Sequence, residues 1–357
     1  MSDTTSPDLA ARWEEMERGD LTEVAPSPSL LPAPAPLFYR PLSDSVGDFV
    51  RWVQTPADRI YLGFNDIDTQ MRGVAPGEML LINGYSHSGK TLFLMEILRA
   101  NRDKPIMYFC PDEPRTLTLI KLVSLITGTP GRMLEQLIEQ DDRETIDMIE
   151  QTASEEFGKL AVFDQFLSMG DMDRAVHETA DNIGEPACIV YDYLELLPTE
   201  DNVASKANTI KAFARRHDVP LVVLHQSSRT SGKDGAKQTI SSGAFGGEQQ
   251  ASHIIGVRRK KFGIEAEIRE IEERAAHGSV SEIALEKLDM LRAELERHSN
   301  TVTLNLVKCK RHDAELVDDI DYYIEQGTGR LKGFRPLSTP APAPQVVWEE
   351  PQLDGGW

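Results

Sequence analysis

The fold is decided by one segment, Gly84-Tyr85-Ser86-His87-Ser88-Gly89-Lys90-Thr91, which fits the pattern GxxxxGK followed by Ser or Thr. The apolar run 79–82 precedes it as an expected strand, and residues 92–98 follow it as an expected helix. Its glycines let the backbone curl tightly and point N–H groups at a phosphate, and the start of the helix adds a partial positive charge. The segment therefore predicts a phosphate-binding loop, or P-loop, between a strand and a helix.

The side chains of this loop suit the binding of ATP with Mg²⁺. Lys90 is expected to reach the β- and γ-phosphates, and the hydroxyl of Thr91 to be a ligand of the metal. His87 is interpreted as a solvent-facing residue, not as a base. The residues expected to contact the nucleotide are Gly84, Tyr85, Ser86, His87, Ser88, Gly89, Lys90 and Thr91.

Apolar, β-branched runs alternate with amphipathic stretches along the rest of the chain. This alternation is typical of an α/β fold with a mostly parallel central sheet and helices on both faces. The expected strands are residues 79–82, 105–109, 160–163, 187–191, 220–224, 253–257 and 302–307.

Three segments stand outside this alternation. Residues 1–42 and 336–357 carry Pro/Ala-rich stretches that cannot bury a core, so both are predicted to be disordered around an α/β domain at 43–335. Residues 262–300 are highly charged, with apolar residues at helical spacing and a break at His277-Gly278. They predict an inserted helical hairpin, which is either a surface decoration or a docking arm for a subunit or partner.

Composition narrows the classes of function. The chain has 38 Lys and Arg and 58 Asp and Glu, so its net charge is -20. This charge argues against non-specific coating of nucleic acid but leaves room for a local basic groove. The 3 cysteines form no CxxC pair and are interpreted as reduced core thiols. No signal sequence or apolar run of spanning length is visible, so a cytoplasmic protein without a membrane partner is expected.

The metal half of the site is expected at the end of another buried strand, where Asp192 follows residues 187–191. A buried carboxylate is costly unless it meets a cation, and in a P-loop fold that cation is the Mg²⁺ shell. A strand-end aspartate that caps a helix is the alternative.

A base that activates water is expected after the strand 105–109. Asp112 and Glu113 follow that strand, and they should emerge at the same edge of the sheet as the P-loop. We favour Glu113 as the base, with an ordinary acidic loop as the alternative.

Further segments, in chain order, resemble the motifs of DnaB-type replicative helicases, a family of RecA-like P-loop ATPases. The resemblance covers about Arg59 to Leu331 outside the hairpin, and it implies a RecA-like ATPase core. The matching segments are 61–68 with 73 and 76–78 ("TGF.DLD…GGL.PGE"), 191–196 ("IDYLQL", with Glu195 in place of Gln), 211–214 with 219–229 ("LKALAKEL.VPVI.LSQLNR") and, in part, 243–252 ("SG.IEQDAD").

The resemblance implies roles for single residues. Glu113 matches the catalytic glutamate, and Gln226 matches a sensor that reads the γ-phosphate and relays its state to a DNA loop. The segment Lys308-Cys309-Lys310-Arg311 matches a "K.R" pattern whose cations reach the nucleotide of a neighbouring subunit. Lys308 would contact the nucleotide, and either Lys310 or Arg311 would be the finger that stabilises the transition state.

Single-stranded DNA would be held by loops that face the centre of a hexameric ring. The Gly/Ser-rich loop after Gln226 carries spaced cations, which suit a strand gripped through its phosphates; a disordered surface loop is the alternative. The basic cluster 258–261 either lines the DNA path or begins the hairpin. The expected DNA contacts are Arg229, Lys233, Lys237, Gly247, Glu248 and Gln249.

Together these features predict an ATP-dependent helicase that forms a homo-oligomer and translocates on single-stranded DNA. It would lack the usual N-terminal primase-binding domain of the family, and a replisome protein could dock on its C-terminal tail or hairpin. The alternatives are a RecA-like recombinase or strand-annealing ATPase, and an ATP-gated loader or regulatory scaffold that does not unwind DNA.

Overall fold

The computed structural model describes residues 41–199, 202–227, 235–237, 239, 247–277 and 282–332. The expected tails lie almost wholly outside these residues, as do Arg229 and Lys233. The chain divides into two units, Met1–Arg51 and Trp52–Trp357. In the first, the described residues form a short 3₁₀ helix, η1 (Leu42–Asp44), and the greater part of α2 (Ser45–Gln54).

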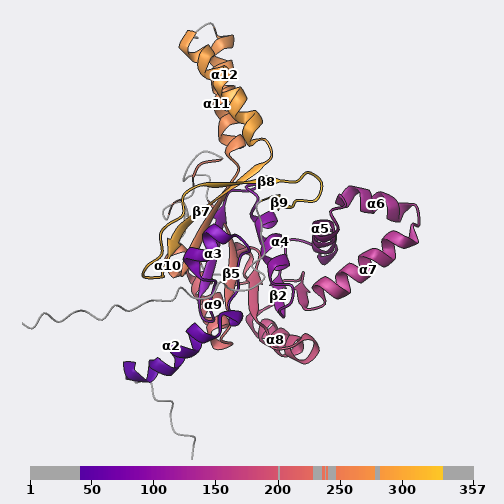
Figure 1. Cartoon of the computed structure of the whole chain (residues 1–357), viewed down its shortest axis with the longest axis vertical. Coiled ribbons are helices and arrows are strands. Elements are labelled where there is room, and N and C mark those ends of the chain that lie inside the picture. Colours follow the sequence, from indigo (N-terminus) through magenta and orange to yellow (C-terminus); the bar gives the residue numbers. More distant parts are fainter. Residues whose placement is uncertain are drawn as a thin grey trace, which may run out of the picture. The chain divides into compact units, whose positions relative to one another are not determined.

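The described part of the second unit is built on a nine-stranded sheet in the order β3-β2-β4-β5-β1-β6-β7-β8-β9 (Figure 1). The strands from β3 to β6 in this order are parallel, and β7, β8 and β9 add to the edge in antiparallel fashion, which confirms the predicted mostly parallel sheet. The strands are β1 (Met79–Gly84), β2 (Ile106–Phe109), β3 (Leu160–Phe163), β4 (Cys188–Tyr191), β5 (Leu221–Gln226), β6 (His253–Arg258), β7 (Thr301–Cys309), β8 (Ile320–Ile324) and β9 (Leu331–Lys332).

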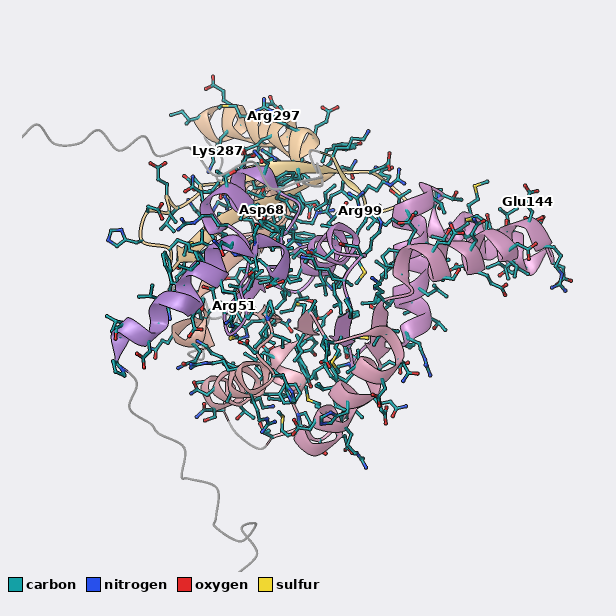
Figure 2. The ribbon with its side chains drawn as sticks, turned by 60° about the horizontal axis from the view of Figure 1, so that its bottom comes forward. Arg51, Asp68, Arg99, Glu144, Lys287 and Arg297 are labelled. Atoms are coloured by element: carbon teal, nitrogen blue, oxygen red, sulfur yellow. The ribbon has the colours of Figure 1, made fainter. Side chains whose placement is uncertain are left out.

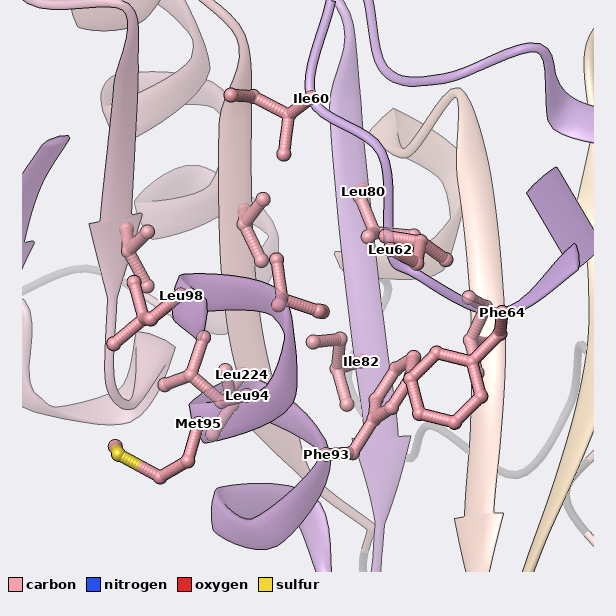
Figure 3. Packing of buried hydrophobic residues seen from close by; sticks show 14 of the residues in the cluster. Ile60, Leu62, Phe64, Leu80, Ile82, Phe93, Leu94, Met95, Leu98 and Leu224 are labelled. Carbon is pink, nitrogen blue, oxygen red and sulfur yellow. The ribbon is translucent and has the colours of Figure 1, made fainter. Parts of the chain in front are cut away.

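Helices cover both faces of this sheet, which explains why its parallel strands read as continuous apolar runs. Leu80 and Ile82 of β1 pack into one core with α4 and α5, shown in Figure 3, while Met79 and Leu81 face the other core, with α8 and α9. The helices are α3 (Asn65–Met71), α4 (Lys90–Ala100), α5 (Arg115–Thr127), α6 (Gly131–Glu139), α7 (Arg143–Phe157), α8 (Met169–Ile183), α9 (Val203–Arg216), α10 (Gly247–Gln250), α11 (Lys260–Ala276) and α12 (Glu282–His298), with short 3₁₀ turns η2 (Pro56–Asp58) and η3 (Leu194–Leu196).

The segment that precedes β1 forms a turn around a buried carboxylate. Asp68 accepts hydrogen bonds from the backbone N–H groups of Leu62 (2.9 Å), Gly63 (2.8 Å) and Phe64 (3.1 Å). These donors replace the water that a buried carboxylate loses, so they make its burial tolerable. The turn places Phe64 edge-on against Phe93 of α4, with ring centroids 5.0 Å apart.

A second buried carboxylate joins α4 to the end of the sheet. Glu96 accepts a hydrogen bond from the backbone N–H of Leu331 in β9 (2.8 Å) and pairs with Arg99 (2.7 Å), which Figure 2 labels. The helix that begins in the P-loop is therefore tied to the antiparallel edge of the sheet.

The helical hairpin lies where the sequence predicted it, with its helices side by side (Figure 1). It has a small apolar core of its own, and its flanks are charged. Salt bridges join the helices at Lys287–Glu267 (3.0 Å) and Arg292–Glu272 (2.9 Å), and Figure 2 shows Lys287 and Arg297 on α12. The core residues are Ile264, Ile268, Ile271, Leu288 and Leu291. Among the described residues, no helix is both long and apolar enough to span a bilayer.

Candidate nucleotide-binding site

The P-loop joins β1 directly to α4, and its backbone explains its glycines. A side chain at Gly84 would collide with the carbonyl oxygen of Val257 and the hydroxyl of Ser88. Gly89 has φ of 101°, in the left-handed region that favours glycine. α4 begins at Lys90, so the N–H groups of its first turn lie beside the loop.

Two ionisable groups of opposite sign are buried around this loop. The Lys90 ammonium donates hydrogen bonds to the carbonyl oxygens of Gly84 and Tyr85, both at 2.8 Å. Burial lowers the pKa of Lys90 to about 8, although Asp192 opposes this shift. Burial raises the pKa of Asp192 to about 6, and the Tyr108 hydroxyl donates a hydrogen bond to its Oδ2 atom (3.1 Å). A phosphate beside Lys90 and a cation beside Asp192 would each relieve the cost of burial.

A cavity of about 670 Å³ opens over the loop, a volume within the usual range for a ligand site. It brings together most of the residues that the sequence predicted for nucleotide chemistry, from five separate segments of the chain. Gly84 and Tyr85 are not among its lining. The lining residues are Ser86, His87, Ser88, Gly89, Lys90, Thr91, Leu92, Cys110, Asp112, Glu113, Asp192, Tyr193, Gln226, Arg259 and Phe262.

The oxygen groups in the cavity fit Mg²⁺. Thr91 and Asp192 both line it, and hydroxyl and carboxylate oxygens are the ligands that this hard cation prefers. Among the described residues, no group of three or more His, Cys, Asp or Glu could hold a metal ion. The remaining ligands would be phosphate oxygens and water, as is usual for Mg²⁺.

Glu113 lies in the cavity and is held by a single lysine. Its Oε2 atom accepts a hydrogen bond from the Lys121 ammonium of α5. Its Oε1 atom is buried and has no hydrogen-bond partner among the described residues. Oε1 is therefore the acceptor that the described residues leave without a donor.

Gln226 ends β5 at the cavity, and its backbone is bound by Glu195, the residue that replaces Gln in the family motif. The Gln226 N–H donates to the Oε1 atom of Glu195 (3.0 Å). The side chain of Gln226 is exposed at the cavity, so it is free to contact a phosphate.

The three cations at the end of β7 lie in different surroundings. The Arg311 guanidinium is 10% exposed and binds both carboxylate oxygens of Glu78 as well as the carbonyl oxygens of Met71 (3.0 Å) and Gly73 (3.2 Å). Lys308 donates to the Glu248 carbonyl oxygen (2.9 Å). Lys310 is exposed. Of the two candidate fingers, Lys310 is therefore the one whose charge faces solvent, whereas Arg311 is bound within its own chain.

The end of β7 lies beside the starts of β6 and β1, and the P-loop lies at the opposite end of these parallel strands. Cys309 pairs with His253 at the start of β6, and the N–H of Lys310 donates to the Ser252 carbonyl oxygen (3.1 Å), while Ser252 in turn donates to Met79 at the start of β1. The P-loop begins at the other end of β1, five residue steps or about 17 Å away. Lys310 therefore does not reach the cavity of its own chain.

The expected DNA contacts divide in the structure. Lys237 is exposed and pairs with Asp318, and Gln249 is exposed on α10. Gly247 and Glu248 are buried, with 3% of Glu248 exposed. A side chain turned into the core cannot contact a DNA strand, so the structure corrects the expectation for Glu248. Gly247 is buried as well and is not exposed for such a contact.

Sequence reasoning missed several residues that line the cavity, among them Arg259 and Phe262. They come from the junction of β6 and α11, which the sequence assigned to the DNA path or to the hairpin. The guanidinium of Arg259 donates to the Ser299 carbonyl oxygen (2.7 Å) and lies 5.8 Å from the Phe262 ring. Burial lowers the pKa of Arg259. Their place just after a strand parallel to β1 was the signal, because such strands end at the P-loop edge.

A P-loop at the end of a central parallel strand, with a largely buried acid directly after β4 and a glutamate after β2, defines a P-loop nucleotide-binding protein with an α/β core. The family model of the DnaB-like helicase C terminal domain matches residues 60–299. The chain therefore belongs to the DnaB-like helicase family, which confirms the resemblance inferred from its motifs.

Curated relatives agree with this family over part of their length. The chain is 23% identical over 197 residues to the replicative DNA helicase DnaB of Haemophilus influenzae, covering 50% of this chain and 41% of the relative. The corresponding values for DnaB of Pasteurella multocida are 21% over 192 residues, with 50% and 41% covered. The chain thus spans about two fifths of the length of these relatives.

Solved structures show the same fold. One solved ATPase domain has a TM-score of 0.60 at 15% identity, covering 82% of this chain and 98% of that one. A DnaB-like replicative helicase, described with its interactions with primase, has a TM-score of 0.60 at 16% identity, covering 82% of this chain and 67% of that one. The RecA-like ATPase fold that the sequence predicted is confirmed.

Proposed function

We propose that this protein hydrolyses ATP between neighbouring copies of itself and uses the energy to move along single-stranded DNA, as a helicase of the DnaB type. One observation carries the proposal. The cavity holds Lys90, Glu113 and Asp192 where the parallel strands end, and the exposed Lys310 lies at the opposite side of the sheet, where those strands begin. Such a molecule is complementary to itself, because each copy supplies a nucleotide edge and a cationic edge.

The proposed chemistry gives each residue one task. The free Oε1 atom of Glu113 accepts a proton from the attacking water, and Lys90 balances the charge of the transferred phosphoryl group. Lys310 of the neighbouring copy adds a second cation as negative charge develops. Bound Mg²⁺ would neutralise the phosphate oxygens, and Thr91 and Asp192 are the residues that would hold it.

The proposed DNA contacts are the loop after Gln226 and the exposed end of α10. Lys237 and Gln249 are the described members of this set, and Arg229 and Lys233 extend it from sequence alone. Cations and backbone amides hold a strand by its phosphates without reading its sequence. A closed ring of copies, expected to be hexameric, would place such loops around a central strand.

The test is ATP hydrolysis with and without an oligothymidylate strand, for the wild type, Glu113→Gln and the matched control Asp112→Asn. Both acids line the cavity, and only Glu113 is proposed as the base. We expect turnover of the wild type and of the control to rise with DNA, and Glu113→Gln to lose at least about 100-fold in kcat. A forked duplex then tests unwinding.

Each other outcome contradicts a definite part of the proposal. Turnover that ignores DNA would exclude a translocating motor and favour a regulatory ATPase. An equal loss in Asp112→Asn and Glu113→Gln would show that the base is wrongly assigned. Activity without strand separation would leave a translocase or an annealing ATPase, and not a helicase.

A further inference from the structure

Among the described residues, buried polar atoms without hydrogen-bond partners gather at one place outside the nucleotide cavity. They belong to His225 at the end of β5, Glu195 in η3 and Glu248 in α10. Folded proteins satisfy nearly all such atoms, so a cluster of exceptions calls for an explanation. The atoms are His225 Nδ1 and Nε2, Glu195 Oε2 and Glu248 Oε1.

The imidazole of His225 lies between the two carboxylates. It is fully buried; its Nδ1 atom is 2.7 Å from Oε1 of Glu195, without the alignment of a hydrogen bond, and its Nε2 atom is 3.9 Å from Oε1 of Glu248. One ring nitrogen faces each carboxylate, and a carboxylate only accepts hydrogen bonds. The ring therefore links the two acids, so a shift of Glu195 changes the surroundings of Glu248 through His225.

One end of the cluster touches the nucleotide site. The Oε1 atom that faces His225 is the same atom that accepts the N–H of Gln226 (3.0 Å). Gln226 lines the cavity, so a movement of its backbone toward a phosphate pulls on Glu195. Lys206 fixes the backbone of Glu195 through its carbonyl oxygen (2.7 Å), which leaves the side chain as the part that can respond.

The other end touches the elements that would serve DNA and the neighbouring copy. Glu248 is in α10, which follows the loop proposed to hold DNA. Its backbone carbonyl accepts a hydrogen bond from Lys308 (2.9 Å), two residues before Lys310, and Lys211 of α9 binds the carbonyl of Gln250 at the other end of α10 (2.5 Å). A shift of α10 is therefore passed to the loop on one side and to the end of β7 on the other.

We propose that Glu195, His225 and Glu248 form a relay that carries the state of the nucleotide from Gln226 to α10, and from there to the DNA loop and the strand end at Lys310. The relay rests on the proposed function in taking Gln226 as the residue that meets the nucleotide and the loop after it as the segment that meets DNA. His225 acts through its neighbours, as a positioning residue, and does not touch nucleotide or DNA.

The first experiment measures hydrogen exchange of the amides of α10 and of its flanks, with and without Mg²⁺ and a slowly hydrolysed ATP analogue. We expect the nucleotide to slow exchange at Gly247–Gln250 in the wild type, and the effect to vanish in His225→Ser and in the isosteric variants Glu195→Gln and Glu248→Gln. His217→Gln is the matched control, because His217 is a partly buried histidine that pairs with Asp173 (2.8 Å) on α8. Thermal unfolding shows that each variant is folded.

The second experiment compares basal and oligothymidylate-stimulated ATP turnover of the same variants. We expect basal turnover within about twofold of the wild type and a stimulation factor lowered about fivefold or more, the size of an ordinary coupling between sites. The double variant His225→Ser/Glu248→Gln should be no worse than the worse single variant, because both break one chain of contacts.

The outcomes separate the relay from the proposed motor. Exchange in α10 that ignores nucleotide in the wild type, or responds equally in all folded variants, would overturn the relay. A wild type whose α10 responds to nucleotide but whose turnover ignores DNA would overturn the motor and keep the relay. Loss of the response in His217→Gln as well would show a general loosening of the core, and would also overturn the relay.

Discussion

The carboxylate of Glu113 depends on one side chain for its position in the cavity. The Lys121 ammonium, in α5 and eight residues farther along the chain, binds one oxygen and leaves the other without a donor among the described residues. A base is effective only where its free oxygen lies within reach of the attacking water. Lys121 is therefore expected to position the base without touching the nucleotide, since it is absent from the lining of the cavity.

Replacing Lys121 with Met should lower kcat for ATP by between about 10-fold and 100-fold while KM changes little, because the base is displaced and the phosphate contacts remain. Steady-state kinetics with oligothymidylate present measure both constants. Lys159→Met is the control, since the Lys159 ammonium binds only the Asp103 carbonyl oxygen at the surface (3.0 Å). An unchanged kcat would show that Glu113 holds its own position.

Glu78, at the turn into β1, lies at the centre of a largely buried cluster of charged side chains. Burial alone would raise its pKa, but hydrogen bonds from His253, Arg311 and the backbone N–H of Ala75 outweigh burial and lower the pKa from 4.5 to about 2. A carboxyl group with a lowered pKa stabilises the fold in its ionised form. Its contribution is complete above pH 4.5 and is lost as the pH falls toward 2.

Urea unfolding of the wild type and of Glu78→Gln should show this dependence. The wild type should be the more stable by about 3 kcal/mol at pH 7, and the difference should shrink steadily below pH 4.5. Asp313→Asn is the control, because Asp313 pairs with Arg72 at the surface and is 70% exposed. A difference that is constant with pH would mean that the charge of Glu78 contributes nothing.

At this scale the sequence predicted residues whose roles follow from a local pattern. Lys90, Asp192 and Glu113 were identified because each stands at a strand end or in a compact motif. The choice between Lys310 and Arg311 could not be made, because it depends on Glu78, which lies 233 residues before Arg311 in the chain. The burial of Glu248 was equally invisible, because it results from the packing of α10 against α9, an element far earlier in the chain.

Among the elements, prediction succeeded for the parallel strands and for β7, and it missed the two outermost antiparallel strands, β8 and β9. The parallel strands are continuous apolar runs, which stand out against their flanks. In β8 the buried positions alternate with exposed ones, and β9 has only 2 residues. Alternation over five residues, or a strand of only two residues, is too short a pattern to be distinguished from a loop in the sequence. β8 and β9 join the sheet only because β7 is already in place.

The hairpin should fold and unfold apart from the rest of the chain. Its core residues touch one another and not the two cores that cover the sheet. Ile271→Asp should melt the ends of α11 and α12 and open them to protease, while the main thermal transition moves by less than about 2 °C. Limited proteolysis and calorimetry measure the two effects.

Ile283→Asp is the matched control for this change, because Ile283 lies in the same hairpin and is 77% exposed, whereas Ile271 is 8% exposed. It should leave both the proteolysis pattern and the main transition unchanged. A large fall in the main transition of Ile271→Asp would show instead that the hairpin core is continuous with the sheet.

For the whole molecule, the separation of Lys310 from the P-loop predicts complementation between inactive chains. Lys90→Ala removes the lysine proposed to bind the nucleotide, and Lys310→Ala removes the proposed finger. In a 1:1 mixture, about a quarter of the interfaces would combine an intact cavity with an intact finger. Turnover of the mixture should therefore exceed that of either variant alone, when the variants are unfolded and refolded together or exchanged between oligomers.

The control mixture combines Lys90→Ala with Glu113→Gln. Both changes damage the cavity side, so no interface regains a complete site, and turnover should stay at the level of the single variants. Failure of the first mixture under conditions where subunits exchange would place the finger elsewhere.

The antiparallel return of β7 has a consequence for how the protein would respond to its own abundance. Because the strand carries Lys310 back to the end of the sheet opposite the P-loop, a solitary chain would, on the proposed function, hold a nucleotide without the second cation around it. Turnover per chain then depends on how many chains have found a neighbour, and it falls on dilution even with ATP in excess. In the proposed assembly, a low concentration of the protein would itself keep ATP turnover low, because chains without a neighbour would hydrolyse little ATP.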